Sequence, residues 1–328
     1  MDEFDFINKV KPSKTYHKQV VVGIGDDAAV YKPTESFNQV ICVDTMVEDV
    51  HFLKHLSSPK EIGYKALAVN LSDLAAMGAV PLYYLVSIAI PTTWTESELI
   101  ELYLGMDELA ELYQVDLIGG DTVSTSAKLI ITVTVIGEVE AHVKTTRNSA
   151  KDGDIVFVTG TIGDSSAGLS VLLEEIDQID PTIENYLINR HKKPTARIEV
   201  GRIISQLERA SLNDISDGLA SELNELSEAS EIGIIINEED LPISEELLSL
   251  HDRFDIKKWA LFGGEDFELV GTTSQDAWEK LKHNCLECGI SITKIGYVTK
   301  KHDNVLLRNK NDQVIELKKS GYNHFKGK

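Results

Sequence analysis

Strand-like and helix-like segments alternate along this chain of 328 residues, and the alternation limits the folds that it can adopt. Runs rich in β-branched and apolar residues predict strands in the first half at 39–45, 82–90, 115–119 and 128–139. Two helices between these strands have clear start signals. Ser58 and Glu61 form one capping box, and Thr95 and Glu98 form another. The first half is therefore predicted to be a mixed α/β structure.

A polar segment separates this half from a second α/β half. The run TTRNSAKDGD contains a turn signal, and a chain of this length suggests two domains at about 150 residues each. We expect the domains to be 1–145 and 146–328. In the second half, strands are predicted near 154–159, 232–236, 267–272 and 292–298. Helices are predicted there near 165–176, 195–208, 217–230 and 275–287.

Charge and hydropathy exclude several classes of protein. The formal net charge is −21 at pH 7, so the chain repels polyanions, and we expect neither a nucleic-acid partner nor docking on an anionic membrane. Any bound phosphate then needs a cation beside it. The longest uncharged run, 74–95, contains Pro81 and Pro91 and predicts a helix end, a turn and a buried strand instead of a membrane span. The N-terminus carries acids where a signal peptide carries bases, which predicts a cytoplasmic location.

The cysteines are too few for a disulfide framework, since the chain has only three, at 42, 285 and 288. Cys285 and Cys288 have the spacing of half a zinc site, but a closed zinc site needs four ligands and no second pair exists. Their setting is typical of a helix end. A structural role is therefore favoured for this pair.

Acidic residues stand beside glycine at several predicted strand ends and turns. The sites are Gly25-Asp26-Asp27, Gly119-Gly120-Asp121, Ser216-Asp217-Gly218 and Gly263-Gly264-Glu265-Asp266. Each alone is typical of an Asx turn. Together they favour a ligand site, because glycine lets a ligand approach the backbone and carboxylates are preferred ligands of hard cations.

Asp73 provides independent evidence from helical periodicity. In the helix predicted over 59–77, Ile62, Ala66 and Asn70 share one face, and Asp73 falls on the same face. A carboxylate aimed at the core must be paired, protonated or metal-bound, because burying it alone is costly. The alternative to a metal ion is a salt bridge to a nearby lysine.

Three further aspartates lie at strand ends, where α/β proteins usually build their sites. Asp44 ends a predicted strand upstream of His51, while Asp214 and Asp217 flank a strand-to-helix junction at which either could instead cap the helix. Magnesium suits the set better than zinc, since the donors are oxygens with almost no histidine or cysteine. The candidate magnesium ligands are Asp27, Asp44, Asp73, Asp121, Asp214 and Asp217.

Familiar nucleotide-binding motifs are absent. The chain has neither a GxxxxGK[ST] loop nor the protein-kinase HRD set. The turn 160–164 precedes a predicted helix and offers backbone N–H groups to a phosphate, although a lone glycine turn is weak evidence. Arg147, in the boundary segment, is suited to clamp an anion with two hydrogen bonds; the alternative is an ordinary solvated arginine.

Seven motifs, taken together, resemble those of the thiamine-monophosphate kinase family. They are GIGDDAAV, VDTMVEDVHF, YKALAVNLSDLAAMGAVP, LIGGDT, VTGTIGDSSAGL, ISDGLASEL and LFGGEDFEL, in the family's order and approximate spacing. The resemblance runs from about residue 21 to the C-terminal GYNHF. It implies a two-domain α/β fold shared with aminoimidazole ribonucleotide synthetase and a homodimer formed through the N-terminal domains. It also implies ATP-dependent phosphorylation of thiamine monophosphate to thiamine diphosphate.

The same resemblance implies roles for individual residues. The six aspartates above match ligands of several magnesium ions. The matching ATP contacts are Tyr103, Gly120, Asp121, Arg147 and Ser216, and the matching contacts to the thiamine substrate are His51, Glu265 and Tyr322. The catalytic set implied is Asp44, Asp73, Asp121 and Arg147. One departure is that Cys42 and Val43 precede Asp44 where the family usually has Ser or Thr, which removes a side-chain hydroxyl and leaves backbone carbonyls.

Other interpretations stay open at this stage. A magnesium-dependent phosphohydrolase, another ATP-using enzyme of the same fold, and a non-catalytic metal-binding protein all need such carboxylates. For a kinase, direct in-line transfer is expected, because no Ser–His, Cys–His or phosphohistidine arrangement is evident in the sequence. A phosphate acceptor with a second pKa of about 6 is already largely ionised near neutral pH and needs no general base.

Overall fold

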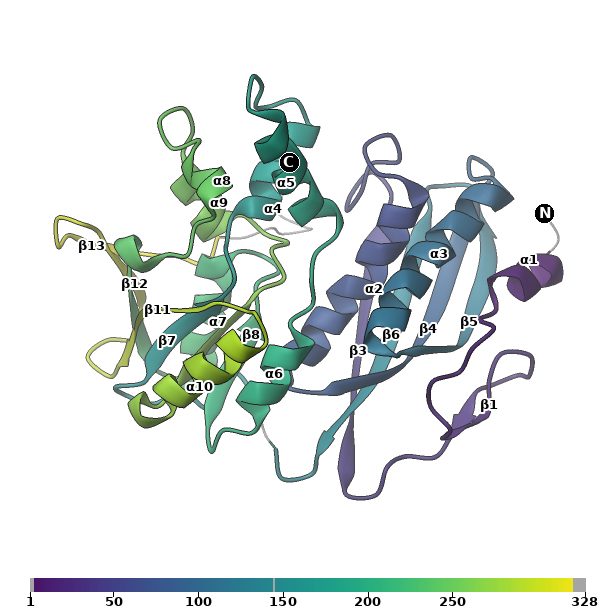
Figure 1. Cartoon of the computed structure of the whole chain (residues 1–328), viewed down its shortest axis with the longest axis horizontal. Coiled ribbons are helices and arrows are strands. Elements are labelled where there is room, and N and C mark those ends of the chain that lie inside the picture. Colours follow the sequence, from purple (N-terminus) through teal and green to yellow (C-terminus); the bar gives the residue numbers. More distant parts are fainter. Residues whose placement is uncertain (1–2, 144, 321–328) are drawn as a thin grey trace. The chain divides into compact units, whose positions relative to one another are not determined.

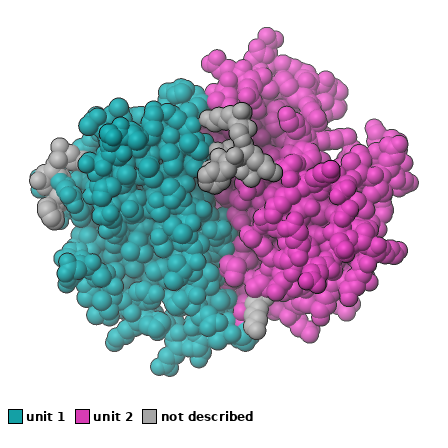
Figure 2. All heavy atoms as spheres, turned by 180° about the vertical axis from the view of Figure 1, so that it is seen from behind, with its two compact units in different colours: residues 1–74, 79–142 teal, residues 75–78, 143–328 magenta. Residues whose placement is uncertain are grey.

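The computed structural model describes residues 3–143 and 145–320 (Figure 1). The chain forms two compact units, 1–74 with 79–142 and 75–78 with 143–328, coloured separately in Figure 2. Residues 75–78 group with the later part of the chain because Gly78 contacts Ser205 and its carbonyl accepts a hydrogen bond from Arg202 Nη1 at 2.6 Å. Each unit contains its own main sheet, so the mixed α/β prediction is confirmed.

The main sheet of the first unit has four strands in the order β3, β6, β4, β5. Their bounds are β3 Phe37–Val47, β4 Val80–Pro91, β5 Asp116–Thr125 and β6 Ile130–Glu140. The pairs β3–β6 and β6–β4 are antiparallel, whereas β4–β5 is parallel. The four predicted strands are thus confirmed with shifted ends, and β3 and β5 form the two edges of the sheet.

Two long helices, α2 (Pro59–Ala76) and α3 (Glu96–Tyr113), cover one face of this sheet (Figure 1). Both predicted capping boxes are present: Ser58 and Glu61 bond each other's backbone N–H, and so do Thr95 and Glu98. The helices approach so closely that each needs a glycine. A Cβ on Gly63 would lie 1.8 Å from a backbone oxygen of α3, and one on Gly105 would lie 1.9 Å from a backbone oxygen of α2.

Among the described residues of the first unit, no helix lies over the other face of the sheet, which we call the uncovered face (Figure 1). One end of this face, at Tyr83 and Ile136, packs against Val20 and Tyr31, which precede β3 in the chain. Side chains alternate between the faces along each strand. On β3 and β5, the residues of the uncovered face include Ile41, Val43 and Val123, which are 63%, 58% and 46% exposed. Apolar side chains therefore line the outer parts of this face, while Val86 and Val133 are buried beneath the helices.

Short elements that the sequence did not predict precede the first long strand. Helix α1 (Glu3–Val10) is followed by two short antiparallel strands, β1 (Val20–Val22) and β2 (Val30–Tyr31). Phe6 is fully buried and packs edge-to-face on Tyr103 of α3, with ring centroids 5.8 Å apart. This contact holds α1 on the end of the helical layer.

The second unit is built on a seven-stranded sheet in the order β13, β12, β9, β11, β7, β10, β8. The strands are β7 Ile155–Thr159, β8 Ala210–Asp214, β9 Gly233–Asn237, β10 Leu269–Thr273, β11 Ile292–Thr299, β12 Val305–Arg308 and β13 Val314–Glu316. The helices are α4 Asp164–Leu172, α5 Pro181–Lys192, α6 Ile198–Ser205, α7 Leu219–Ser230, α8 Glu245–Leu248, α9 Ile256–Phe262 and α10 Gln275–Glu287, with the 3₁₀ turn η1 Glu238–Asp240. Its core joins strand residues such as Val158 and Ile234 to Leu223 of α7.

The strands and helices predicted for the second half are confirmed, with ends shifted by a few residues. Sequence reasoning missed the short elements α8, α9, β12 and β13. It also missed α5, although Asp180 caps that helix and Pro181 occupies its first turn. The expected interpretation of 74–95 is correct, since it comprises the end of α2, a turn and β4. Cys285 is buried in α10 and Cys288 caps that helix, which agrees with a structural role. Within the described residues, no helix is long and apolar enough to cross a membrane.

Candidate active site

In the first unit, a carboxylate pair lies between β3 and α2. Asp44 and Asp73 are joined by a side-chain hydrogen bond, and Asp73 also contacts the Cys42 thiol. Burial raises the pKa of Asp44, and this effect is only partly offset by the Asp73 contact and by the charge of His51. Two carboxylates can share such a contact only with a proton or a cation between them. The prediction that Asp73 points inward from its helix is thus confirmed. Its neighbours are the Asp44 carboxyl group and the Cys42 thiol.

Asn70 aligns β3 with α2 beside this pair. Its side-chain oxygen accepts a hydrogen bond from the backbone N–H of Asp44 at 3.0 Å, while its amide nitrogen donates to the Ala66 carbonyl at 3.0 Å. The Cys42 thiol donates to the Asn70 carbonyl at 3.3 Å. Burial, followed by the charges of Asp73 and Asp44, raises the Cys42 pKa far above its ordinary value. This environment favours the neutral thiol of Cys42 over the nucleophilic thiolate.

His51 lies close enough to Asp44 for its charge to act on that carboxyl group. Its Nδ1 accepts a hydrogen bond from the backbone N–H of Val47 at 3.0 Å. This bond fixes the ring's orientation and leaves any proton of the neutral ring on Nε2. The structure therefore pairs Asp44 with Asp73, and His51 lies within electrostatic range of Asp44.

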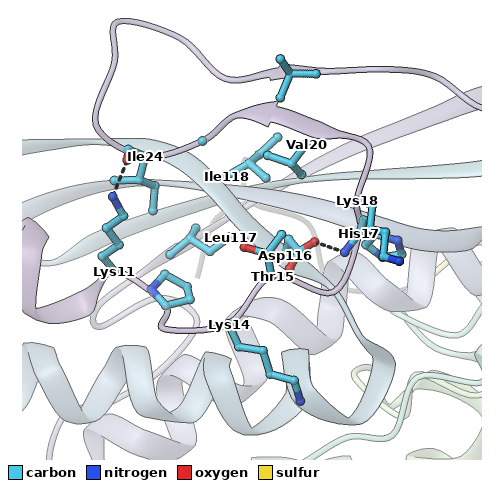
Figure 3. Close-up of a pocket in the computed structure, with 13 residues that line it drawn as sticks. Lys11, Lys14, Thr15, His17, Lys18, Val20, Ile24, Asp116, Leu117 and Ile118 are labelled. Carbon is cyan, nitrogen blue, oxygen red and sulfur yellow. Dashed lines mark hydrogen bonds between the residues drawn. The ribbon is translucent and has the colours of Figure 1, made fainter.

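Asp27 lies in an exposed turn that the N-terminal segment supports. Its backbone N–H donates to Asp26 Oδ1 at 2.9 Å, and Gly25 adopts φ +124°, which favours glycine. Figure 3 shows Lys11 Nζ beside the Ile24 carbonyl, to which it donates at 2.7 Å. The turn that carries Asp27 is therefore tied to the segment that follows α1.

A cavity of about 450 Å³ lies between this N-terminal segment and the start of β5 (Figure 3). Asp116 at its wall is 4% exposed and accepts hydrogen bonds from the backbone N–H groups of Tyr16 and His17, at 2.7 and 2.8 Å. None of the predicted site residues lines this cavity. The hydrogen bonds of Asp116 hold the segment upstream of Asp27 against the sheet edge.

Gly120 and Asp121 lie on β5. A Cβ on Gly120 would be 2.1 Å from the Val86 carbonyl oxygen, so only glycine fits there. Asp121 is paired with Ser87 of β4 and is exposed on the face without helices. Tyr103, the remaining predicted ATP contact of this unit, is 9% exposed and packs on Phe6. The contact that the structure shows for Tyr103 is thus the packing of its ring on Phe6.

In the second unit, the junction between β8 and α7 carries three predicted residues. Asp214 ends β8 and is 4% exposed, while Ser216 and Asp217 form the turn before α7. Arg147 reaches the same region: its Nε donates to Asn213 Oδ1 at 3.0 Å, and its Nη1 lies 2.9 Å from Glu225 Oε2. Arg147 therefore lies beside the junction that carries Ser216, another of the predicted ATP contacts.

Two residues that sequence reasoning missed complete this junction. Asn213 and Glu222 are 1% and 3% exposed and hydrogen-bond to each other. Burial, followed by the charge of Asp214, raises the pKa of Glu222 to about 8. The available signal was an amide and an acid flanking Asp214-Ile215-Ser216-Asp217, but either type is also common near a helix start.

Glu265 lies in a strained segment packed on that turn. Its φ is +66° and that of Phe267 is +51°, a backbone region that non-glycine residues rarely adopt. The Glu265 N–H donates to the Ser216 carbonyl at 2.7 Å. His191, 8% exposed, places Nδ1 3.5 Å from a Glu265 carboxylate oxygen. Such strain concentrates at functional sites.

The acids that follow Glu265 have structural partners. Asp266 accepts hydrogen bonds from the Gly163 and Ser165 N–H groups at 2.7 and 3.1 Å, at the start of α4. Its burial raises its pKa to about 7. Glu268 pairs with Arg190 at 3.0 Å and with Arg197 at 2.6 Å. The turn 160–164 is thus occupied internally by Asp266, which weakens its case as a phosphate site.

The donors suit magnesium in kind, being carboxylates with little sulfur or nitrogen. Across residues 3–143 and 145–320, however, no three His, Cys, Asp or Glu side chains are arranged so that they could hold an ion. The carboxylates form separate groups within each unit. Tyr322, the third predicted substrate contact, lies outside the described residues.

Comparisons with known proteins agree with this architecture. Residues 25–139 match the family model of the AIR synthase related protein, N-terminal domain, and residues 151–308 match that of the C-terminal domain. A thiamine-monophosphate kinase of Bacillus subtilis (strain 168) is 56% identical over 327 residues, covering 99% of this chain and 100% of the relative.

Two solved structures extend the likeness. The thiamine-monophosphate kinase of Stenotrophomonas maltophilia K279a superposes with a TM-score of 0.85 at 30% identity, covering 95% of this chain and 98% of that one. A ThiL structure complexed with AMPPCP and TMP gives 0.79 at 34% identity, covering 98% and 97%. E. coli HypE also gives 0.79, but at 19% identity it shows the fold alone. The chain therefore belongs to the thiamine-monophosphate kinase family, with the two-domain fold of the AIR synthase related proteins.

Proposed function

We propose that this protein transfers the γ-phosphoryl group of ATP to thiamine monophosphate in one in-line step, assisted by several magnesium ions. Membership of the family carries the ATP-dependent phosphorylation of thiamine monophosphate. The observation that carries the metal-assisted mechanism is the Asp44–Asp73 contact beside His51. A carboxylate pair that needs a positive charge is suited to an ion that also binds phosphate oxygens.

Magnesium would supply Lewis-acid stabilisation of the transferred phosphoryl group when bound. In our proposal its ligands are Asp44 and Asp73 in one group, Asp214 and Asp217 in another, and Asp27 and Asp121. Arg147 would bind ATP phosphate, because its exposed guanidinium projects from the junction that carries Asp217. Gly120 and Ser216 would contact ATP through the backbone and hydroxyl, and Tyr103 would act through packing.

His51 and Glu265 are the proposed contacts to thiamine monophosphate, together with Tyr322. Glu265 would supply a carboxylate for the cationic thiazolium, from a segment before β10 whose backbone is left-handed at this residue. Burial raises the Cys42 pKa, which disfavours a thiolate nucleophile and supports direct transfer over a phosphorylated enzyme.

We further propose a homodimer formed through the uncovered face of the four-stranded sheet. Exposed apolar patches on sheets mark association sites, and Ile41, Val43 and Val123 supply such a surface. Asp121 lies on this face, so it would enter the interface. One chain keeps Asp44 and Asp121 apart, but Asp44 lies on the edge strand β3, so a second copy that extends past this edge would contribute its Asp121 to the site built on Asp44.

Acceptor dependence tests the kinase proposal against a phosphohydrolase. A kinase forms ADP from ATP and magnesium only when thiamine monophosphate is present, whereas a hydrolase forms ADP and phosphate without it. ADP formed at the same rate with and without the acceptor would refute the proposal.

A further inference from the structure

The turn that carries Asp214, Ser216 and Asp217 is held from behind by a buried side chain. Glu222, in the first turn of α7, reaches back so that its Oε1 accepts the backbone N–H of Asp217 at 3.1 Å. Its Oε2 accepts a hydrogen bond from the Asn213 side-chain amide. Both carboxylate oxygens therefore have protein donors, and the side chain is 3% exposed. Glu222 is poorly placed to bind an ion itself.

Asn213 links this acid to Arg147. The Nε of arginine can only donate, so the Asn213 atom that faces it at 3.0 Å must be the side-chain oxygen. The amide nitrogen then faces Glu222. Hydrogen bonds thus run from Arg147 to Asn213 and from Asn213 to Glu222, and the same carboxylate receives the Asp217 N–H. Glu225 neutralises the outer part of the guanidinium at 2.9 Å.

We infer that Asn213 and Glu222 are positioning residues for phosphoryl transfer, which fix Arg147 relative to the turn of Asp217. The inference rests on the proposed function, which assigns Arg147 to ATP and Asp217 to magnesium. A long arginine side chain on an exposed segment loses rotamer freedom when its Nε is bound to a buried amide. Asn213 and Glu222 therefore order the Arg147 side chain before ATP binds, which lowers the entropy cost of binding.

The directionality of the hydrogen bonds allows a sharp test. Glu222→Gln keeps the shape but has one acceptor, so its amide N–H₂ must face either the Asp217 N–H or the Asn213 amide. Asn213→Asp keeps the Arg147 contact but sets a carboxylate oxygen against Glu222. The double variant Asn213→Asp/Glu222→Gln restores the hydrogen bond between 213 and 222 with donor and acceptor exchanged, leaves the bonds from Arg147 and from the Asp217 N–H in their original direction, and keeps the total charge. Glu228→Gln is the matched control, since it removes an exposed acid from the same helix.

The measurements are kcat and KM for ATP, the magnesium concentration at half-maximal rate, and thermal melting for all five proteins. We expect each single variant to lower kcat/KM by about 10- to 100-fold, which is the effect of leaving a buried polar group unpaired. KM for ATP and the magnesium requirement should both rise. The double variant should return to within about threefold of the parent protein, a coupling that independent sites would not show. Glu228→Gln should match the parent protein.

Two results would overturn the inference. One is single variants with parent-like kinetics. The other is a double variant that melts like the parent protein but is as impaired in turnover as Glu222→Gln. That result would mean that the carboxylate at 222 acts on the substrate or metal itself and not through Asn213. If both single variants fail to fold, the double variant still decides, because the inference requires that it fold and turn over. An inactive parent protein would refute the proposed function instead, and the affinity for Mg-ATP, measured by calorimetry, would then test the pair.

Discussion

Asp44 and Asp121 lie on opposite edges and opposite faces of one four-stranded sheet. Asp44 is on β3, where it pairs with Val133 and faces α2; Asp121 is on β5, where it pairs with Ser87 and faces away from the helices. At about 4.8 Å per strand, three strand spacings separate their backbones by roughly 14 Å. One chain therefore cannot bring both carboxylates to one ion.

This separation predicts complementation between inactive variants. Asp44→Asn and Asp121→Asn should each lower kcat by about 100-fold or more. If a site combines Asp44 of one copy with Asp121 of the other, a heterodimer of the two variants has one intact site. Dissociating and reassociating an equal mixture should then restore about a quarter of the parent activity, since half of the dimers are mixed.

The matched control combines Asp44→Asn with Asp73→Asn. These two residues touch within one chain, so every dimer of that mixture has only damaged sites. Recovery in the control, or no recovery with Asp121→Asn, would contradict the shared site.

The uncovered face predicts the effect of a charge on association. Ile41→Asp places a carboxylate on the apolar sheet face, where the wild-type side chain is 63% exposed, and should weaken dimerisation by tenfold or more. Leu286→Asp is the control, because that residue is 68% exposed on α10 in the other unit. Analytical ultracentrifugation across a concentration series distinguishes them. Equal association of both variants would rule out this face as the interface.

The raised pKa of Asp44 predicts how stability depends on pH without magnesium. Burial raises that pKa above the ordinary 3.8, so just above pH 4 the folded protein binds a proton more readily than the unfolded chain does. Stability should therefore fall as pH rises through this window. Asp44→Asn should lose that component of the fall, and added magnesium should oppose it in the parent protein. Melting curves in metal-free buffer check this; a steeper decline in Asp44→Asn would contradict it.

The Cys42 environment predicts an unreactive thiol. Burial and the neighbouring aspartates raise its pKa, so the thiolate fraction at pH 8 is small and alkylation is slow. Cys288 is exposed and should react with iodoacetamide first. Peptide mapping by mass spectrometry over time gives both rates. Rapid modification of Cys42 in the folded protein would show that the pair with Asp73 does not form.

Much of the fold and part of the site followed from local sequence signals. The capping residues at 58 and 95 located the starts of α2 and α3. Helical periodicity placed Asp73 on the face of α2 that points towards the sheet. Both predictions succeeded because capping and periodicity depend on residues only a few positions apart. The separation of Asp44 from Asp121 depends on strand order, which no local pattern encodes. Glu222 escaped notice for a similar reason: its partners Asn213 and Asp217 become neighbours only when the β8–α7 turn closes.

Transfer of label from ATP tests the central claim most directly. The protein is incubated with [γ-³²P]ATP, magnesium and thiamine monophosphate, and the products are separated. We predict that the label enters thiamine diphosphate, one for each ADP formed, and that chelating magnesium stops both products. Label released as inorganic phosphate at a rate independent of thiamine monophosphate, or transfer that persists without a divalent cation, would contradict a magnesium-assisted kinase.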